Sequence, residues 1–131
     1  MKPAMAPAKA RPKYYDLNLA HLPAPGLLSI FHRVTGLVLF FVAIPVVLLA
    51  LQQTLQSQAG WDHWKSLLAT PLAKLVVLGF VWSFLHHFFA GIRYLLLDVH
   101  VGIALAPART SARIVIAAAL VGTLLAGVWI W

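Results

Sequence analysis

The sequence predicts an all-α membrane protein with three transmembrane helices and a cytoplasmic N-terminus. Hydrophobic residues make up 62% of the 131 residues and charged residues only 10%, whereas a soluble domain carries roughly 25% charged residues. The few charges also separate long uncharged stretches, such as the one between Arg33 and Asp62. A helix of about 18 uncharged residues is ~27 Å long, close to the ~30 Å thickness of the bilayer hydrocarbon.

The expected spans are residues 29-52, 71-97 and 110-131, within a transmembrane domain that covers residues 27-131. Residues 1-26 are expected to form an irregular N-terminal cytoplasmic segment, because its prolines interrupt a helix. These are Pro3, Pro7, Pro12, Pro23 and Pro25. Pro45 lies inside the first span, where a kink is tolerated if neighbouring helices cover the freed carbonyl.

The positions of the cations predict how the chain crosses the membrane. Eight of the ten Lys and Arg residues precede the first span or flank the second loop, namely Lys2, Lys9, Arg11, Lys13, Arg33, Arg93, Arg109 and Arg113. The positive-inside rule places these regions in the cytoplasm. Four tryptophans then fall at the opposite interface: Trp61, Trp64, Trp129 and Trp131. A net charge of +7 would suggest nucleic acid in a soluble protein, but this placement indicates a lipid membrane and no nucleic acid.

Histidine within an apolar span is the strongest indication of chemistry, because a polar residue costs free energy in lipid. His87 shares a helix face with Ser83, Gly91 and Tyr94, and its neutral imidazole could bind a haem iron. His86 points ~100° away from His87. The alternative for His87 is a hydrogen bond to a neighbouring helix.

Positive charge gathers where the spans meet the cytoplasmic interface. His32 and Arg33 lie at that end of the first span, and Arg93 lies at that end of the second. A haem held by His87 could direct its propionates toward these three side chains. The alternative is that Arg33 and Arg93 only extend to the lipid headgroups.

Ser29 and Arg33 are spaced i, i+4, which puts a hydroxyl and a guanidinium on one helix face. This pair suits a quinone, because the carbonyl oxygen gains negative charge on reduction and is stabilised by a cation and by donors. The alternative is that Ser29 is an ordinary residue near a helix start.

Three segments of the sequence resemble the family of succinate dehydrogenase cytochrome b556 subunits, and the resemblance spans nearly the whole chain. The segments are RPKYYDLNL, SIFHRVTG and HFFAGIRYLLLD, at residues 11-19, 29-36 and 87-98. The resemblance implies that His87 is an axial ligand of haem b and that His32 lies near the haem propionates. It also implies that Ser29, Ile30 and Arg33 contact ubiquinone. One position departs from the family, which often has His where this chain has Tyr94.

The same resemblance implies partners and a location. The family anchors a flavoprotein subunit and an iron–sulfur subunit, and it pairs with a second small membrane anchor that supplies the other haem ligand. This chain has no cysteine and no Gly-rich nucleotide motif. We therefore expect a non-catalytic membrane subunit of succinate dehydrogenase that passes electrons to ubiquinone. The short N-terminal segment favours a bacterial inner membrane over a mitochondrial one.

Two alternatives belong to other classes. One is the anchor of a fumarate-reducing quinol enzyme, in which electrons run in the opposite direction. The other is a small membrane transporter or structural protein without a cofactor. A haem b spectrum would separate the second alternative from the haem-carrying anchors.

Overall fold

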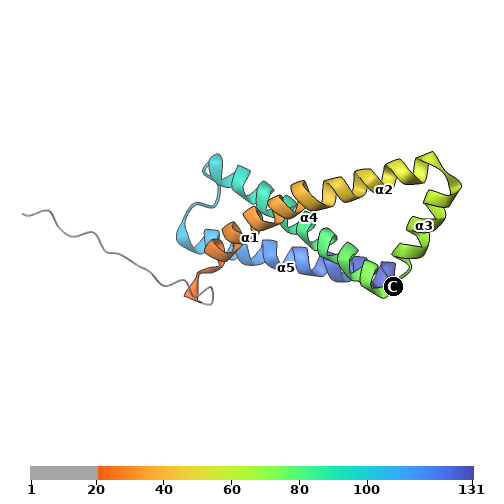
Figure 1. The fold of residues 1–131 in the computed structure, drawn as a ribbon. Helices are drawn as coiled ribbons and strands as arrows, with labels where there is room; N and C mark the ends of the chain where they lie inside the picture. Colours follow the sequence, from red (N-terminus) through yellow and green to blue (C-terminus); the bar gives the residue numbers. More distant parts are fainter. Residues whose placement is uncertain (1–20) are drawn as a thin grey trace, which may run out of the picture.

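Three helical stretches in the computed structural model are long and apolar enough to cross a membrane: Ala24–Gln56, Pro71–Asp98 and Leu105–Ile130. The predicted all-α fold with three transmembrane helices is therefore confirmed (Figure 1). The structure describes residues 21–131. Lys2, Lys9, Arg11, Lys13 and the RPKYYDLNL segment lie outside the described residues. The cytoplasmic position of the N-terminus stays a prediction.

The first span is built from α1 (Ala24–Val38), the π-helical turn η2 (Leu39–Ala43) and α2 (Ile44–Gln56). It extends beyond the predicted 29-52 at both ends. The expectation that Pro25 interrupts a helix is wrong, because Pro25 occupies the first turn of α1. A proline is tolerated there since the first N–H groups of a helix have no partner within it.

The helix widens locally just before Pro45. A proline ring inside a helix collides with the carbonyl of the residue four positions earlier, here Phe41. The chain responds with the π-helical turn η2, after which the Ile44 N–H donates to the Leu39 carbonyl. Such turns are a known way for a helix to absorb a local disruption. The sequence predicted a disturbance at this proline but not its form.

A helix that the sequence analysis did not predict lies between the first two spans. This helix, α3 (Gln58–Leu68), is capped by Ser57, whose hydroxyl accepts a hydrogen bond from the Gly60 N–H at 3.0 Å. The Trp64 indole N–H donates to the Gln53 side chain of α2 at 2.8 Å. A Cβ atom on Gly60 would clash with the Gln53 carbonyl oxygen. The corner between α2 and α3 is therefore tightly fixed.

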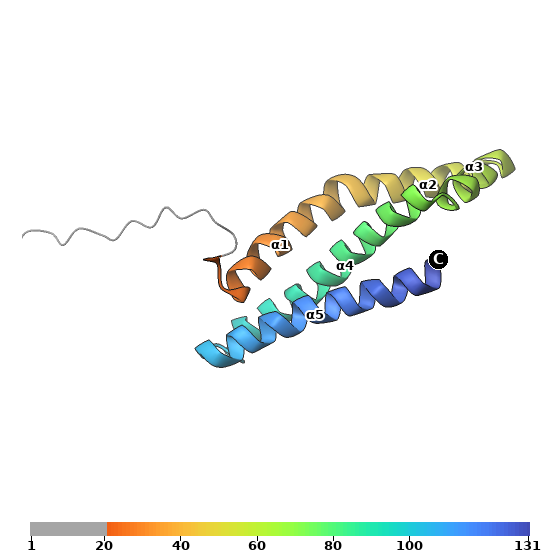
Figure 2. The same ribbon diagram turned by 90° about the horizontal axis from the view of Figure 1, so that it is seen from below.

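Helices α4 (Pro71–Asp98) and α5 (Leu105–Ile130) run antiparallel along each other (Figures 1 and 2). After α4, the Val101 N–H donates to the Leu96 carbonyl, and His100 adopts a positive φ of 65°. This is a Schellman ending, a common way to satisfy the last carbonyls of a helix. Helix α5 begins at Leu105, five residues before the predicted start at residue 110. The prediction followed the apolar span, and the helix continues beyond that span through polar residues.

The two ends of the bundle hold different elements. The start of α1 and the loop between α4 and α5 lie at one end, and α3 and the C-terminus lie at the other (Figure 1). At the second end, the Lys74 ammonium lies 5.2 Å from the centre of the Trp131 ring. The tryptophans of α3 and of the C-terminus thus share one end, as expected.

The buried residues are confined to one half of the described bundle. Leu28, Ala90, Ala112 and Val115 form its centre. We call residues 24–43, 83–98 and 105–119 the packed half, and residues 44–80 and 120–131 the open half. Within residues 21–131, every buried side chain belongs to the packed half, and α2 and α3 contain none.

Candidate functional site

His87 projects from α4 toward α1 in the packed half. Its Nδ1 atom lies 3.0 Å from the backbone carbonyl oxygen of His32 and 3.5 Å from the Thr35 hydroxyl. A carbonyl can only accept, so Nδ1 carries the proton in this hydrogen bond. The other ring nitrogen, Nε2, is then left with a lone pair, as a metal ligand requires.

This arrangement fits a haem ligand. An iron-bound histidine usually donates its other N–H to a carbonyl or a carboxylate, which fixes the orientation of the ring. The His32 carbonyl fills that role for His87. Within residues 21–131, no group of three or more His, Cys, Asp or Glu side chains is placed to hold a metal ion.

Thr35 and Gly36 support the His87 ring, a role that the sequence analysis missed. The Thr35 hydroxyl is buried and donates to the Phe31 carbonyl at 2.7 Å. A Cβ atom on Gly36 would lie 2.9 Å from Cε1 of His87, so only glycine leaves room for the imidazole. Both residues belong to the SIFHRVTG segment, and small residues at a close helix crossing are the signal that could have identified them.

His32 packs directly on His87. The two imidazole rings are stacked, with centres 4.1 Å apart and planes 11° from parallel. The Tyr94 ring lies beside His32, with ring centres 5.1 Å apart. The Tyr94 hydroxyl is buried and has no hydrogen-bond partner among the described residues. His87, His32 and Tyr94 therefore form a continuous row along the contact between α1 and α4.

His86 points to the other side of this contact, as its spacing predicted. Its side chain is 1% exposed and packs near the rings of Phe31 and Trp82, at 6.0 and 5.4 Å between centres. The imidazole also interacts with the backbone of Leu28. Its Nε2 atom is buried without a hydrogen-bond partner among residues 21–131. His86 thus joins α4 to α1 on a different side from His87.

Ser29 and Arg33 fall on the α1 face that meets His87. Residues 29, 32, 33 and 36 share one helix face through i, i+3, i+4 and i+7 spacing, and two of them, His32 and Gly36, contact the His87 ring. Ser29 is half-buried and Arg33 is exposed. Ile30 is 37% exposed and points ~100° away from Ser29.

Arg93 is held mainly by α5, and its guanidinium carbon also lies 5.5 Å from the centre of the Tyr94 ring. It points ~120° away from His87 around α4. Its guanidinium donates to the Ser111 hydroxyl at 2.9 Å and to the Ala108 carbonyl at 3.0 Å, both on α5. With 6% of its surface exposed, the side chain is buried against α5 rather than extended to the lipid headgroups.

Comparisons with known proteins identify relatives of this chain. The model of the succinate dehydrogenase/fumarate reductase transmembrane subunit family matches residues 7–126. The succinate dehydrogenase cytochrome b556 subunit of Coxiella burnetii is 36% identical over 122 residues, which cover 92% of this chain and 97% of that relative.

Proposed function

This chain belongs to the succinate dehydrogenase/fumarate reductase transmembrane subunit family, and we propose that it is the haem b-binding anchor of a bacterial succinate dehydrogenase. As a family member it is a membrane subunit of an oxidoreductase complex. The observation that carries the haem proposal is the His87–His32 hydrogen bond, which leaves Nε2 of His87 free to bind iron.

His87 would hold the haem iron, and its neighbours would hold the ring in place. Haem b supplies a one-electron carrier when it is bound. His32 stacks on the ligand, and Arg33 adds positive charge on the same face of α1. We assign these two residues to the propionate side. Arg93 adds a nearby positive charge, but its donors are engaged by α5, so its contribution would be electrostatic.

Ubiquinone is the proposed electron acceptor, held by Ser29, Ile30 and Arg33. The Ser29 hydroxyl would donate a hydrogen bond to a quinone carbonyl, and the Arg33 guanidinium would stabilise the negative charge that develops on reduction. The exposed side chain of Ile30 offers apolar contact to the quinone ring. Arg33 is exposed on α1, where a quinone could approach it from lipid.

The assembly that we propose contains a flavoprotein subunit, an iron–sulfur subunit and a second membrane anchor that would supply the other haem ligand. This chain would take no part in succinate oxidation itself. The relative from a bacterium supports a bacterial inner membrane.

We also propose that the N-terminus lies in the cytoplasm, so that the loop before the second span and the loop after it face opposite sides of the membrane. Cysteines that replace His63 and Ile103 should therefore react with an impermeant thiol reagent from opposite faces of the membrane.

The haem assignment can be tested on the purified complex. His87→Ala should change the iron from low-spin to high-spin, because one axial ligand is lost, and should lower the haem content. His86→Ala is the matched control, since the neighbouring histidine faces Phe31 and Trp82 instead. A low-spin spectrum that survives in His87→Ala would assign the ligand to another residue.

The quinone assignment needs a separate measurement. Ser29→Ala should slow succinate-dependent ubiquinone reduction by about 10-fold. This is less than the 10²–10³-fold loss found at sites shielded from water, because Ser29 is only half-buried. Reduction of an artificial acceptor at the soluble subunits should be unchanged. Equal ubiquinone rates in the assembled variant and the parent complex would remove Ser29 from the site.

A further inference from the structure

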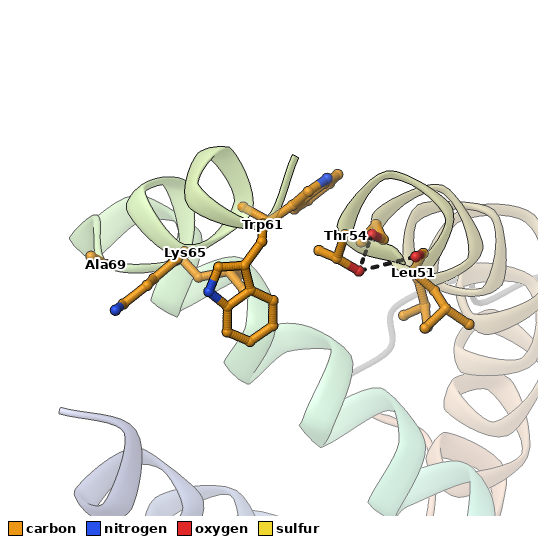
Figure 3. Close-up of a pocket in the computed structure, with 9 residues that line it drawn as sticks. Leu51, Thr54, Trp61, Lys65 and Ala69 are labelled. Atoms are coloured by element: carbon orange, nitrogen blue, oxygen red, sulfur yellow. Dashed lines mark hydrogen bonds between the residues drawn. The ribbon is translucent and has the colours of Figure 1, made fainter. Parts of the chain in front are cut away.

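Two apolar cavities lie in the open half, away from the site described above. Their volumes are about 620 and 510 Å³, within the ~300–1,000 Å³ range of small-molecule sites. They share four lining residues, Val47, Ala50, Trp64 and Leu68. The larger one lies between α2 and α3 (Figure 3). The smaller one extends between α2 and α4. We call this joined space the wedge.

The shape of the wedge is set by the position of α3, which is fixed by hydrogen bonds and a close backbone contact. Helix α3 connects α2 to α4 and so holds these two helices apart. The Ser57 cap, the Trp64–Gln53 hydrogen bond and the close approach at Gly60 fix the corner between α2 and α3. Thr70 caps α4, and its hydroxyl accepts from the Ala73 N–H at 3.3 Å. Both ends of α3 are therefore anchored.

The polar groups at the rim of the wedge are donors. Lys65 and Trp61 are among the residues that line the larger cavity, and Figure 3 shows the ammonium end of Lys65 pointing out of the cavity, away from α2. Among the described residues that line this cavity, none is acidic. Lys65 lies at the border of the apolar face of α3, which Trp61, Trp64 and Leu68 form through i, i+3 and i+7 spacing. Trp and Lys at such a border are typical of the headgroup region of a membrane.

We propose that the wedge binds a phospholipid with an anionic headgroup. One acyl chain occupies the apolar space between α2 and α4, and the phosphate group lies beside Lys65 and Trp61. The lining of both cavities is almost entirely apolar, as an acyl chain requires, and the ammonium of Lys65 supplies a positive charge outside the cavity, where the phosphate would lie. The site belongs to the leaflet on which α3 lies. It requires neither haem nor quinone, so it stands apart from the proposed electron transfer.

Photoreactive lipids can test this site on the intact complex in nanodiscs. The probes are phosphatidylglycerol and phosphatidylcholine, each with a diazirine near the end of one acyl chain. Mass spectrometry should find cross-links at residues 46–54 and 61–69. We expect about five-fold more labelling by phosphatidylglycerol, because a Lys near the membrane surface favours an anionic lipid by about that factor.

Two matched pairs of variants separate the headgroup contact from the acyl-chain contact. Lys65→Gln should remove the preference for phosphatidylglycerol, whereas Lys74→Gln should keep it, because Lys74 lines neither cavity. Ala50→Leu should reduce labelling by both probes several-fold, since Ala50 lines both cavities. Ala117→Leu, on an exposed face of α5, should have no effect.

Two outcomes would overturn the proposal. Equal labelling by both probes, unaffected by Lys65→Gln, would mean that bulk lipid fills the wedge without headgroup recognition. An absence of lipid cross-links at residues 46–54 and 61–69 in the assembled complex would mean that another subunit covers the wedge.

Discussion

The packed half and the open half use the same kind of apolar sequence in different ways. In the packed half, α1 lies against α4 and α5, and polar side chains such as Thr35, His86 and Arg93 are buried. In the open half, α2 and α4 are held apart by α3, and large apolar side chains stay exposed, including Leu49, Leu55 and Leu72. The candidate site residues all lie in the packed half.

The difference shows where this chain needs precise geometry. A ligand histidine needs an imidazole fixed at a defined orientation, and the packed half supplies this through the His32 carbonyl and Gly36. The apolar side chains of the open half need no fixed orientation, because lipid hydrocarbon chains cover them as well as another helix would. A membrane protein can therefore keep one half loosely packed without a loss of stability.

The contrast between the two halves predicts that two leucine substitutions differ strongly in their effect on conformational stability. Leu28→Ala should lower the conformational stability by about 2 kcal/mol, because Leu28 is fully buried and its removal leaves a cavity. Leu49→Ala, at a 48% exposed position of α2, should change it by less than about 0.5 kcal/mol. The measurement is the denaturation midpoint of the purified complex. Similar losses for both variants would show that a partner subunit packs on α2.

A loss of stability of comparable size is expected from one of two glycine substitutions in the open half. Gly60→Ala should destabilise the α2–α3 corner by about 1–3 kcal/mol, because the added Cβ meets the Gln53 carbonyl. Gly79→Ala should be neutral or stabilising by up to about 1 kcal/mol, since nothing lies within 4 Å of its Cβ position. Limited proteolysis within α3 would report the corner directly. Equal protease resistance in both variants would contradict a tightly fixed corner.

The smallest effect is expected at the end of α4. His100 holds a positive φ of 65°, which glycine adopts without a steric penalty. His100→Gly should therefore stabilise the chain by about 1 kcal/mol or less and leave the haem spectrum unchanged. Differential scanning of the purified complex would measure the shift. A loss of stability would mean that the His100 side chain makes a contact in the assembled complex.

Much of the fold could be predicted because charge is informative in a membrane. The uncharged stretches bounded by Arg33, Lys74, Arg93 and Arg113 located three spans without any knowledge of packing. The missed helix, α3, has polar residues such as Asp62 and His63 on one face, so it does not stand out by hydrophobicity. Its Ser57 cap and the spacing of Trp61, Trp64 and Leu68 were the available signals.

The site was predictable only as a set of residues on helix faces. The spacing within α4 separated His87 from His86, and the structure places them on different sides of α1. The partner of His87 is a backbone carbonyl, which every residue carries, so no sequence pattern could have indicated His32 in that role. The partners of Arg93 depend in the same way on how α5 packs on α4.

The hydrogen bonds of Arg93 have a consequence for biogenesis. Its partners, Ala108 and Ser111, leave the ribosome after α4 is complete, because they lie 15 and 18 residues further along the chain. Until then the guanidinium has no protein partner on α5, and a charged side chain is costly in hydrocarbon. We therefore expect α4 to leave the insertion channel together with α5, as a helical hairpin. A photoreactive residue in α4 should therefore still cross-link to the insertion channel in stalled chains whose α5 is inside the ribosome, and the cross-link should weaken in chains whose α5 has emerged.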